Sequence, residues 1–170
     1  MSHVKNKTKW CLDKAEKELK KVKSHRGLMA VGPSLEKARQ YLAKADHYLK
    51  ATDYLKQGNF SDISASTVFY CMYHCLLAIA AKFGYESRNQ ECTFALISAL
   101  IEDGQIDLEQ SMLDKLATVD VSEDSQTSLE IREQYQYGTN LSLKNEAIYK
   151  DLVSLAKDFL TKTRAIVEKK

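Results

Sequence analysis

The least polar stretch of the chain runs from Ser61 to Phe83, where apolar residues leave almost no polar face. A helix that is apolar nearly all round must be surrounded by other elements or lie in a membrane. Its first seven residues are largely small and polar, whereas a membrane span needs about 20 predominantly apolar residues. The stretch therefore predicts the central helix of a soluble helical bundle.

Amphipathic helices are predicted on both sides of this stretch, because apolar residues recur every three or four positions, the spacing of one helical face. These helices cover 4–22, 35–57, 94–103, 107–119, 129–137 and a last stretch that begins after residue 140 and runs to the C-terminus. The turn at 58–60 is so short that the helices beside it must lie antiparallel. No segment of useful length shows strand spacing. The predicted fold is all-α: an antiparallel up-and-down helical bundle with an additional N-terminal amphipathic helix.

The chain of 170 residues fits one bundle domain preceded by a separate helix. The stretch from Ser24 to Pro33 interrupts the helical pattern with Gly27, Gly32 and the chain's single proline. We therefore predict that residues 1–33 form a basic N-terminal helix and linker, and that residues 34–170 form the bundle. Six glycines and one proline are few, which favours long helices over a turn-rich β architecture.

The net charge of +2 conceals two oppositely charged segments. Residues 1–26 contain nine Lys or Arg against three acidic residues, and residues 102–133 contain two basic residues against ten acidic ones. The basic arm could contact nucleic-acid phosphates, or it could dock on the acidic segment of the same chain or of a partner subunit. A solvated charged face is the most common outcome for such runs, and all three interpretations stay open.

The start of the chain has no apolar leader segment, so a cytoplasmic location is expected. In that compartment the four cysteines, Cys11, Cys71, Cys75 and Cys92, are predicted to be reduced thiols. No cofactor site is indicated, since the chain has no phosphate-cradling Gly-Lys loop, no nucleophile elbow and no metalloprotease His-Glu pair.

Cys71, His74 and Cys75 have the spacing of one helical face. Two thiolates and an imidazole could be zinc ligands, but nothing in the spacing supplies a fourth ligand. Buried, inert cysteines and a core histidine are the favoured interpretation of so apolar a segment, and we predict no metal.

The aromatic residues and one arginine are the other candidates for chemistry. Seven tyrosines could line a groove in which bases stack, although packing between helices is favoured; they are Tyr41, Tyr48, Tyr54, Tyr70, Tyr73, Tyr135 and Tyr137. Arg132 is one of only two basic residues in the acidic segment. Its guanidinium could hold a phosphate in a fork geometry, and the alternative, favoured on physical grounds alone, is an ion pair with Glu130, Glu133 or an acid from another helix.

Three stretches in this order resemble the HEPN family of small helical-bundle proteins, over residues 34 to 168. They are AKADHYLKATDYLKQGNFSDI, FYCMYHCLLAIAAKFGYES and IREQYQYG. The resemblance implies a bundle of four or five helices, usually a homodimer. Many members are metal-independent ribonucleases, and others are toxins beside a nucleotidyltransferase antitoxin or bind RNA or nucleotides without cutting.

The family's catalytic signature is an Arg, four to six residues and then a His. Arg132 matches the Arg, but Tyr137 stands where the His is expected, and no His follows His74. A phenol ordinarily ionises near pH 10, which makes it a poor base at neutral pH. Catalysis by Arg132 and Tyr137 is therefore left open.

From the resemblance we expect an RNA- or nucleotide-binding homodimer, with Arg132 on the phosphate and Tyr135 and Tyr137 beside it. It would act with a nucleotidyltransferase partner in a toxin–antitoxin or defence setting, away from membranes. The alternative is a non-catalytic helical module for protein–protein interaction.

Overall fold

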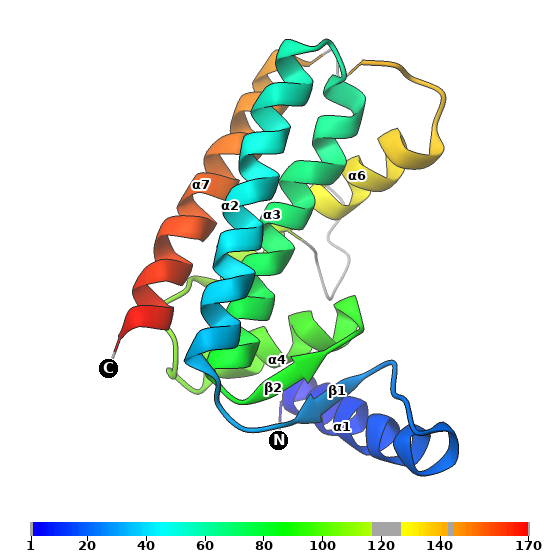
Figure 1. The fold of residues 1–170 in the computed structure, drawn as a ribbon, viewed down its shortest axis with the longest axis vertical. Coiled ribbons are helices and arrows are strands. Elements are labelled where there is room, and N and C mark those ends of the chain that lie inside the picture. Colours follow the sequence, from blue (N-terminus) through cyan, green and yellow to red (C-terminus); the bar gives the residue numbers. More distant parts are fainter. Residues whose placement is uncertain (1, 117–126, 143–144, 170) are drawn as a thin grey trace.

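The computed structural model describes residues 2–116, 127–142 and 145–169, which form an all-α helical bundle (Figure 1). The all-α bundle predicted from the sequence is confirmed. The elements are α1 (His3–Val22), β1 (Leu28–Ala30), α2 (Leu35–Gln57), α3 (Ser61–Lys82), β2 (Tyr85–Ser87), α4 (Gln90–Glu102), α5 (Gln110–Leu116), α6 (Ser128–Tyr137) and α7 (Glu146–Glu168).

Helix α3 is the axis of the bundle, as its apolar pattern predicts. It contacts α2, α4, α6 and α7, and Figure 1 shows α7 and α6 on opposite sides of the antiparallel α2–α3 pair. Phe69, Met72, Leu76 and Ile79 are fully buried along it. Of the described helices, α3 alone is long and apolar enough to cross a membrane, which is weak evidence because most of it is enclosed by the bundle.

The predicted linker is a folded segment that joins α1 to the bundle. Within it, β1 pairs antiparallel with β2, Leu28 opposite Ser87 and Ala30 opposite Tyr85. The sequence does not indicate these strands, because three residues are too few to show alternation. Lys5 of α1 also forms an ion pair with Asp103, 2.5 Å away, so α1 docks at the beginning of the acidic segment.

Gly84 turns the chain between α3 and β2 in a left-handed conformation, with φ of 86°. Its carbonyl accepts hydrogen bonds from the backbone N–H groups of Val31 and Gly32, at 2.8 and 3.2 Å. A Cβ on Gly84 would lie 2.9 Å from the backbone nitrogen of Pro33, which is too close for a carbon atom unless the backbone at Pro33 shifts.

Gly84→Ala is therefore expected to lower the free energy of unfolding by about 2–3 kcal/mol, from left-handed strain and overpacking together. Gly104→Ala is the matched control, because Gly104 has φ of 64° and no atom near its Cβ position, and it should cost about 1 kcal/mol from strain alone. Urea denaturation measures the free energy of unfolding of both variants. Equal losses in the two variants would contradict the close approach of residues 31–33 to Gly84.

The expectation that all four cysteines are reduced is wrong for two of them. Cys11 of α1 and Cys92 of α4 form a disulfide across 81 residues of sequence, and Cys71 and Cys75 are free and buried. The pair was not predictable because the sequence pattern placed α1 outside the core domain. The cytoplasmic location stays a prediction, but reduced cysteines no longer support it.

Candidate functional site

Helix α6 holds Arg132 against the central helix. The helix begins with a capping box, in which the Thr127 hydroxyl accepts from the Glu130 N–H and the Glu130 carboxylate accepts from the Thr127 N–H. This cap fixes the first turn, so Ile131 and Arg132 are buried in the side of α6 that contacts α3. Glu130 is thus engaged in the cap, and Arg132 has a different acidic neighbour.

The Arg132 guanidinium lies over an aromatic ring and bonds at both of its terminal nitrogens. Its central carbon is 5.0 Å from the centre of the Phe69 ring, Nη1 donates to the Tyr70 hydroxyl at 3.3 Å, and Nη2 donates to Glu133 Oε1 at 3.1 Å. Within the described part of the chain, Nε has no hydrogen-bond partner. The predicted ion pair with Glu133 is confirmed, and it involves a buried cation and an acid whose side chain is 52% exposed.

Among the described residues, neither of the two tyrosines expected beside Arg132 forms a hydrogen bond or a cation–ring contact with it. Tyr137 is 76% exposed at the end of α6, while Tyr135 is half-buried against the core. Five residues of helix make one full turn and about 140° more, so Tyr137 lies on a different face of α6 from Arg132. The groups that contact Arg132 are Phe69, Tyr70 and Glu133, and a single chain therefore does not form an Arg132–Tyr137 pair.

Four half-exposed rings form a row beside Arg132, which we call the aromatic face: Tyr41 and Tyr48 of α2, and Tyr70 and His74 of α3. Ring centres are 5.7 Å apart for Tyr48 and Tyr70, 5.1 Å for Tyr48 and His74, and 6.1 Å for Tyr41 and His74. These contacts confirm the predicted packing between helices for Tyr41, Tyr48 and Tyr70, and the outer parts of these rings stay accessible. The prediction is wrong for Tyr54 and Tyr137, which are 77% and 76% exposed.

Lysines lie over the same rings. The ammonium groups of Lys37 and Lys44 are 5.5 and 5.3 Å from the ring centres of Tyr41 and Tyr48. The sequence does contain this signal, because each lysine precedes its tyrosine by four residues, one turn of α2. The aromatic face thus carries two lysines at its α2 edge and the Arg132–Glu133 ion pair at its other end.

His74 belongs to the aromatic face, a role that the sequence pattern did not indicate. Its Nδ1 lies 2.8 Å from the Tyr70 carbonyl oxygen, and since a carbonyl only accepts, Nδ1 carries the proton. Burial lowers the pKa of His74, so the ring is neutral at pH 7 and Nε2 is left as a hydrogen-bond acceptor. Tyr70 therefore joins Arg132, through its hydroxyl, to His74, through its carbonyl.

The zinc alternative finds no support in the geometry. Cys71 and Cys75 are buried in the core, and burial raises the pKa of the Cys75 thiol, which disfavours the thiolate that a metal needs. Among the described residues, no three His, Cys, Asp or Glu side chains are placed to hold a metal ion. The structure agrees with the inert, buried cysteines favoured from the sequence.

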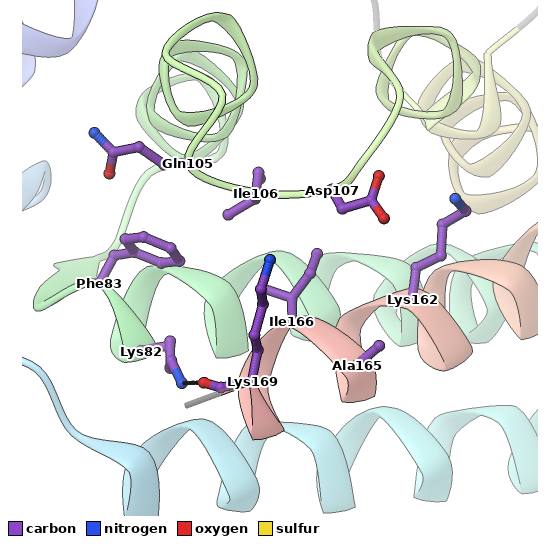
Figure 2. A pocket seen from close by; sticks show the side chains of 9 residues that line it. All are labelled: Lys82, Phe83, Gln105, Ile106, Asp107, Lys162, Ala165, Ile166 and Lys169. Atoms are coloured by element: carbon purple, nitrogen blue, oxygen red, sulfur yellow. Dashed lines mark hydrogen bonds between the residues drawn. The ribbon is translucent and has the colours of Figure 1, made fainter.

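A pocket of about 360 Å³ lies at the end of the bundle where α3 and α7 end (Figure 2). Figure 2 shows Phe83, Ile106 and Ile166 around its apolar interior. Two of its three basic residues are engaged: Lys82 donates to the backbone carbonyls of Val167 and Lys169, and Lys162 pairs with Glu109 at 2.8 Å, while the Lys169 side chain lines the pocket together with Asp107. These contacts leave the pocket poorly suited to a phosphate, and the aromatic face with Arg132 is the stronger candidate site.

Comparison with models of known protein families and with curated proteins finds no match for this chain. The resemblance to the HEPN family therefore stays a prediction. The functional argument rests on the contacts of Arg132 and of the aromatic face.

Proposed function

We propose that this protein is a HEPN-like RNA- or nucleotide-binding protein that uses the aromatic face and Arg132 together. The observation that supports the proposal is the bond from Arg132 Nη1 to the Tyr70 hydroxyl, which holds a guanidinium at the end of a row of half-exposed rings. RNA recognition by proteins combines these two elements, since unpaired bases stack on aromatic side chains and basic groups contact the backbone.

Arg132 is suited to a phosphate because it is held in place before the ligand arrives. The guanidinium is 5.0 Å from the centre of the Phe69 ring and bonded to Tyr70, so little conformational freedom is lost on binding. Its Nη2 is occupied by one oxygen of Glu133, which is half exposed. A phosphate oxygen would replace that carboxylate oxygen, and Glu133 would turn into solvent.

Binding without cleavage is the function that this geometry supports better. Tyr137 is exposed at the end of α6, and the neutral His74 is joined to Arg132 only through Tyr70. Cleavage by a homodimer, as the resemblance implies, would need a second copy to bring its own base to Arg132. A nucleotidyltransferase partner and a toxin–antitoxin or defence setting belong to the same proposal.

The alternative of a protein-interaction module is supported by a different surface. Tyr54, Phe60 and Ile63 are 77%, 54% and 47% exposed around the turn between α2 and α3. Exposed apolar side chains gathered on one surface are typical of protein contact sites. This surface is separate in the fold from α6, so the two functions can be tested independently.

Arg132→Lys is expected to weaken binding of a labelled single-stranded RNA by about tenfold to a hundredfold, because Lys keeps the charge but loses the fork of donors. Glu133→Gln should tighten binding, because it removes the carboxylate that competes for Nη2. Fluorescence anisotropy with and without chelator measures binding, and gel electrophoresis of the same samples detects cleavage.

Arg39→Lys is the matched control, since Arg39 pairs with Glu168 on an exposed edge and should leave RNA affinity unchanged. Thermal denaturation of each variant distinguishes a weakened site from an unfolded protein. Equal RNA affinity in the wild type, Arg132→Lys and Glu133→Gln would refute this site. No RNA binding at all would favour the interaction surface at Tyr54, Phe60 and Ile63.

A further inference from the structure

Helix α1 exposes the chain's single tryptophan between two ammonium groups. Trp10 is 51% exposed, and the Nζ atoms of Lys7 and Lys14 are 4.9 and 5.0 Å from its ring centre. Burial is normally favourable for so large an apolar ring, so an exposed tryptophan suggests a binding surface. An exposed lysine alone does not, because most lysines are exposed.

The positive charge beside Trp10 is incompletely neutralised. A hollow of about 280 Å³ next to the ring is lined by Lys14, Lys17 and Lys21, together with Asp13 and Glu18. Within the described ranges, no acidic side chain forms an ion pair with Lys17 or Lys21 (the salt bridges of α1 involve Lys5, Lys7, Lys14 and Lys20). Two uncompensated ammonium groups thus lie two and three helical turns beyond the indole.

The position of this surface is fixed by the rest of the fold. Cys11, next to Trp10, is joined to Cys92 of α4, and Lys7 pairs with Glu91 at 3.1 Å. Gly27 also packs closely against Cys11 and Ala15 on the buried side of α1. The helix cannot turn about its axis without breaking these contacts, so the indole and the lysines are presented in a constant arrangement.

We infer that this surface, the Trp10 face (Lys7, Trp10, Lys14, Lys17 and Lys21), binds a single-stranded nucleic acid. A base takes the place of one of the two ammonium groups over the indole and stacks there, and the phosphates on either side contact the lysines, the combination by which proteins bind unpaired strands. A duplex would offer phosphates but no free base. The inference extends the proposed function by a second contact surface and rests on residues separate from Arg132.

A membrane surface fits these residues less well. An interfacial helix needs apolar side chains together on one face, below a basic one. Two aliphatic side chains of α1, Leu19 and Val22, are exposed. Leu19 follows Trp10 by nine residues, about two and a half turns, and so lies on the opposite side of the helix, and Val22 follows it by twelve, about three and a third turns, and lies about a third of a turn round from it. Trp10 therefore has lysines rather than aliphatic side chains as neighbours, which favours a polyanion with stacking bases.

Trp10 fluorescence tests the inference directly, because the chain has one tryptophan and the signal reports on this face alone. Titration with a uridine oligonucleotide of about 12 nucleotides should quench the fluorescence in a saturable way. Lys17→Ala/Lys21→Ala should weaken the binding and lower the slope of log affinity against log salt by about 1.4, or about 0.7 for each phosphate that is no longer neutralised.

Matched variants separate charge from stacking. Lys150→Ala/Lys157→Ala removes the same charge from exposed positions on α7 and should leave the quenching unchanged. With labelled RNA and anisotropy, Trp10→Ala should bind roughly five- to a hundredfold more weakly, and Trp10→Phe should recover part of the loss. A circular dichroism melt confirms that each variant is folded.

The outcomes distinguish this inference from the proposed function. RNA binding that depends on Arg132 but neither quenches Trp10 nor responds to Lys17→Ala/Lys21→Ala would overturn the inference and leave the proposed function standing. Quenching of Trp10 that Arg132→Lys leaves unchanged, together with weaker binding of labelled RNA by Trp10→Ala, would support the inference alone. Equal quenching by a duplex of the same length, or by anionic vesicles without RNA, would also overturn it.

Discussion

Replacing Phe69 with alanine should lower the free energy of unfolding by about 3–5 kcal/mol, the usual cost of emptying a buried aromatic site. Phe69 has no exposed surface, and its ring stacks on Tyr73 at 6.1 Å between ring centres. The substitution also removes the ring under the Arg132 guanidinium. Arg132 would lose its support and the affinity of the protein for RNA would fall together with its stability.

Phe60→Ala is the matched control, because Phe60 precedes the same helix and is 54% exposed. It should change the free energy of unfolding by less than about 0.5 kcal/mol. Urea denaturation followed by circular dichroism measures both variants. A loss below about 1 kcal/mol for Phe69→Ala would contradict the position of this ring at the centre of the bundle.

Phe69→Leu separates stability from function, since leucine fills much of the site but has no ring. The cost in stability should be smaller than for alanine, while the interaction between a cation and an aromatic face is removed completely. If RNA affinity falls in Phe69→Leu although the protein remains folded under the conditions of the assay, Phe69 positions Arg132. Unchanged affinity would mean that Tyr70 and Glu133 are sufficient to hold the guanidinium.

The helical architecture was predictable from the sequence because its signals are local and long. The spacing of apolar residues defines α2, α3 and α7 over more than five turns each, and a stretch as apolar as 61–83 has to be central. The three-residue strands could not be predicted, because they are short and depend on contacts between distant segments. Their pairing depends on Gly84, whose carbonyl bonds the 31–32 backbone, and such a tertiary interaction leaves no period in the sequence.

The candidate site is predictable only in part. The charge of Arg132 contrasts with the surrounding acids, and its ion pair with Glu133 follows from sequence proximity. Its bond to Tyr70, 62 residues earlier, could not be inferred, because it depends on how α6 packs on α3. The Arg-to-His spacing of the HEPN resemblance suggests that Tyr137 belongs to the site, but it considers only the spacing in the sequence. In a helix, two residues five positions apart lie on different faces.

Removing the disulfide between Cys11 and Cys92 should lower the free energy of unfolding by about 2–4 kcal/mol. The cross-link closes a loop across 81 residues, and a link that closes a long loop removes much conformational freedom from the unfolded chain. Cys11 and Ala15 are the buried residues of α1, so the helix has little other apolar contact to hold it. The Cys11→Ala/Cys92→Ala variant should therefore loosen α1 first.

Urea denaturation with and without a thiol reductant measures this effect. The wild type should lose stability when reduced, whereas the Cys11→Ala/Cys92→Ala variant should not respond, because Cys71 and Cys75 are already free thiols. Thiol titration in denaturant without reductant should find these two and no others, and the quenching of Trp10 by RNA should weaken once α1 is released. Titration of all four cysteines in the unreduced protein would contradict the disulfide and support the expectation that every cysteine is a reduced thiol. The ion pairs of Lys5 and Lys7 would then be the main link between α1 and the α4 region.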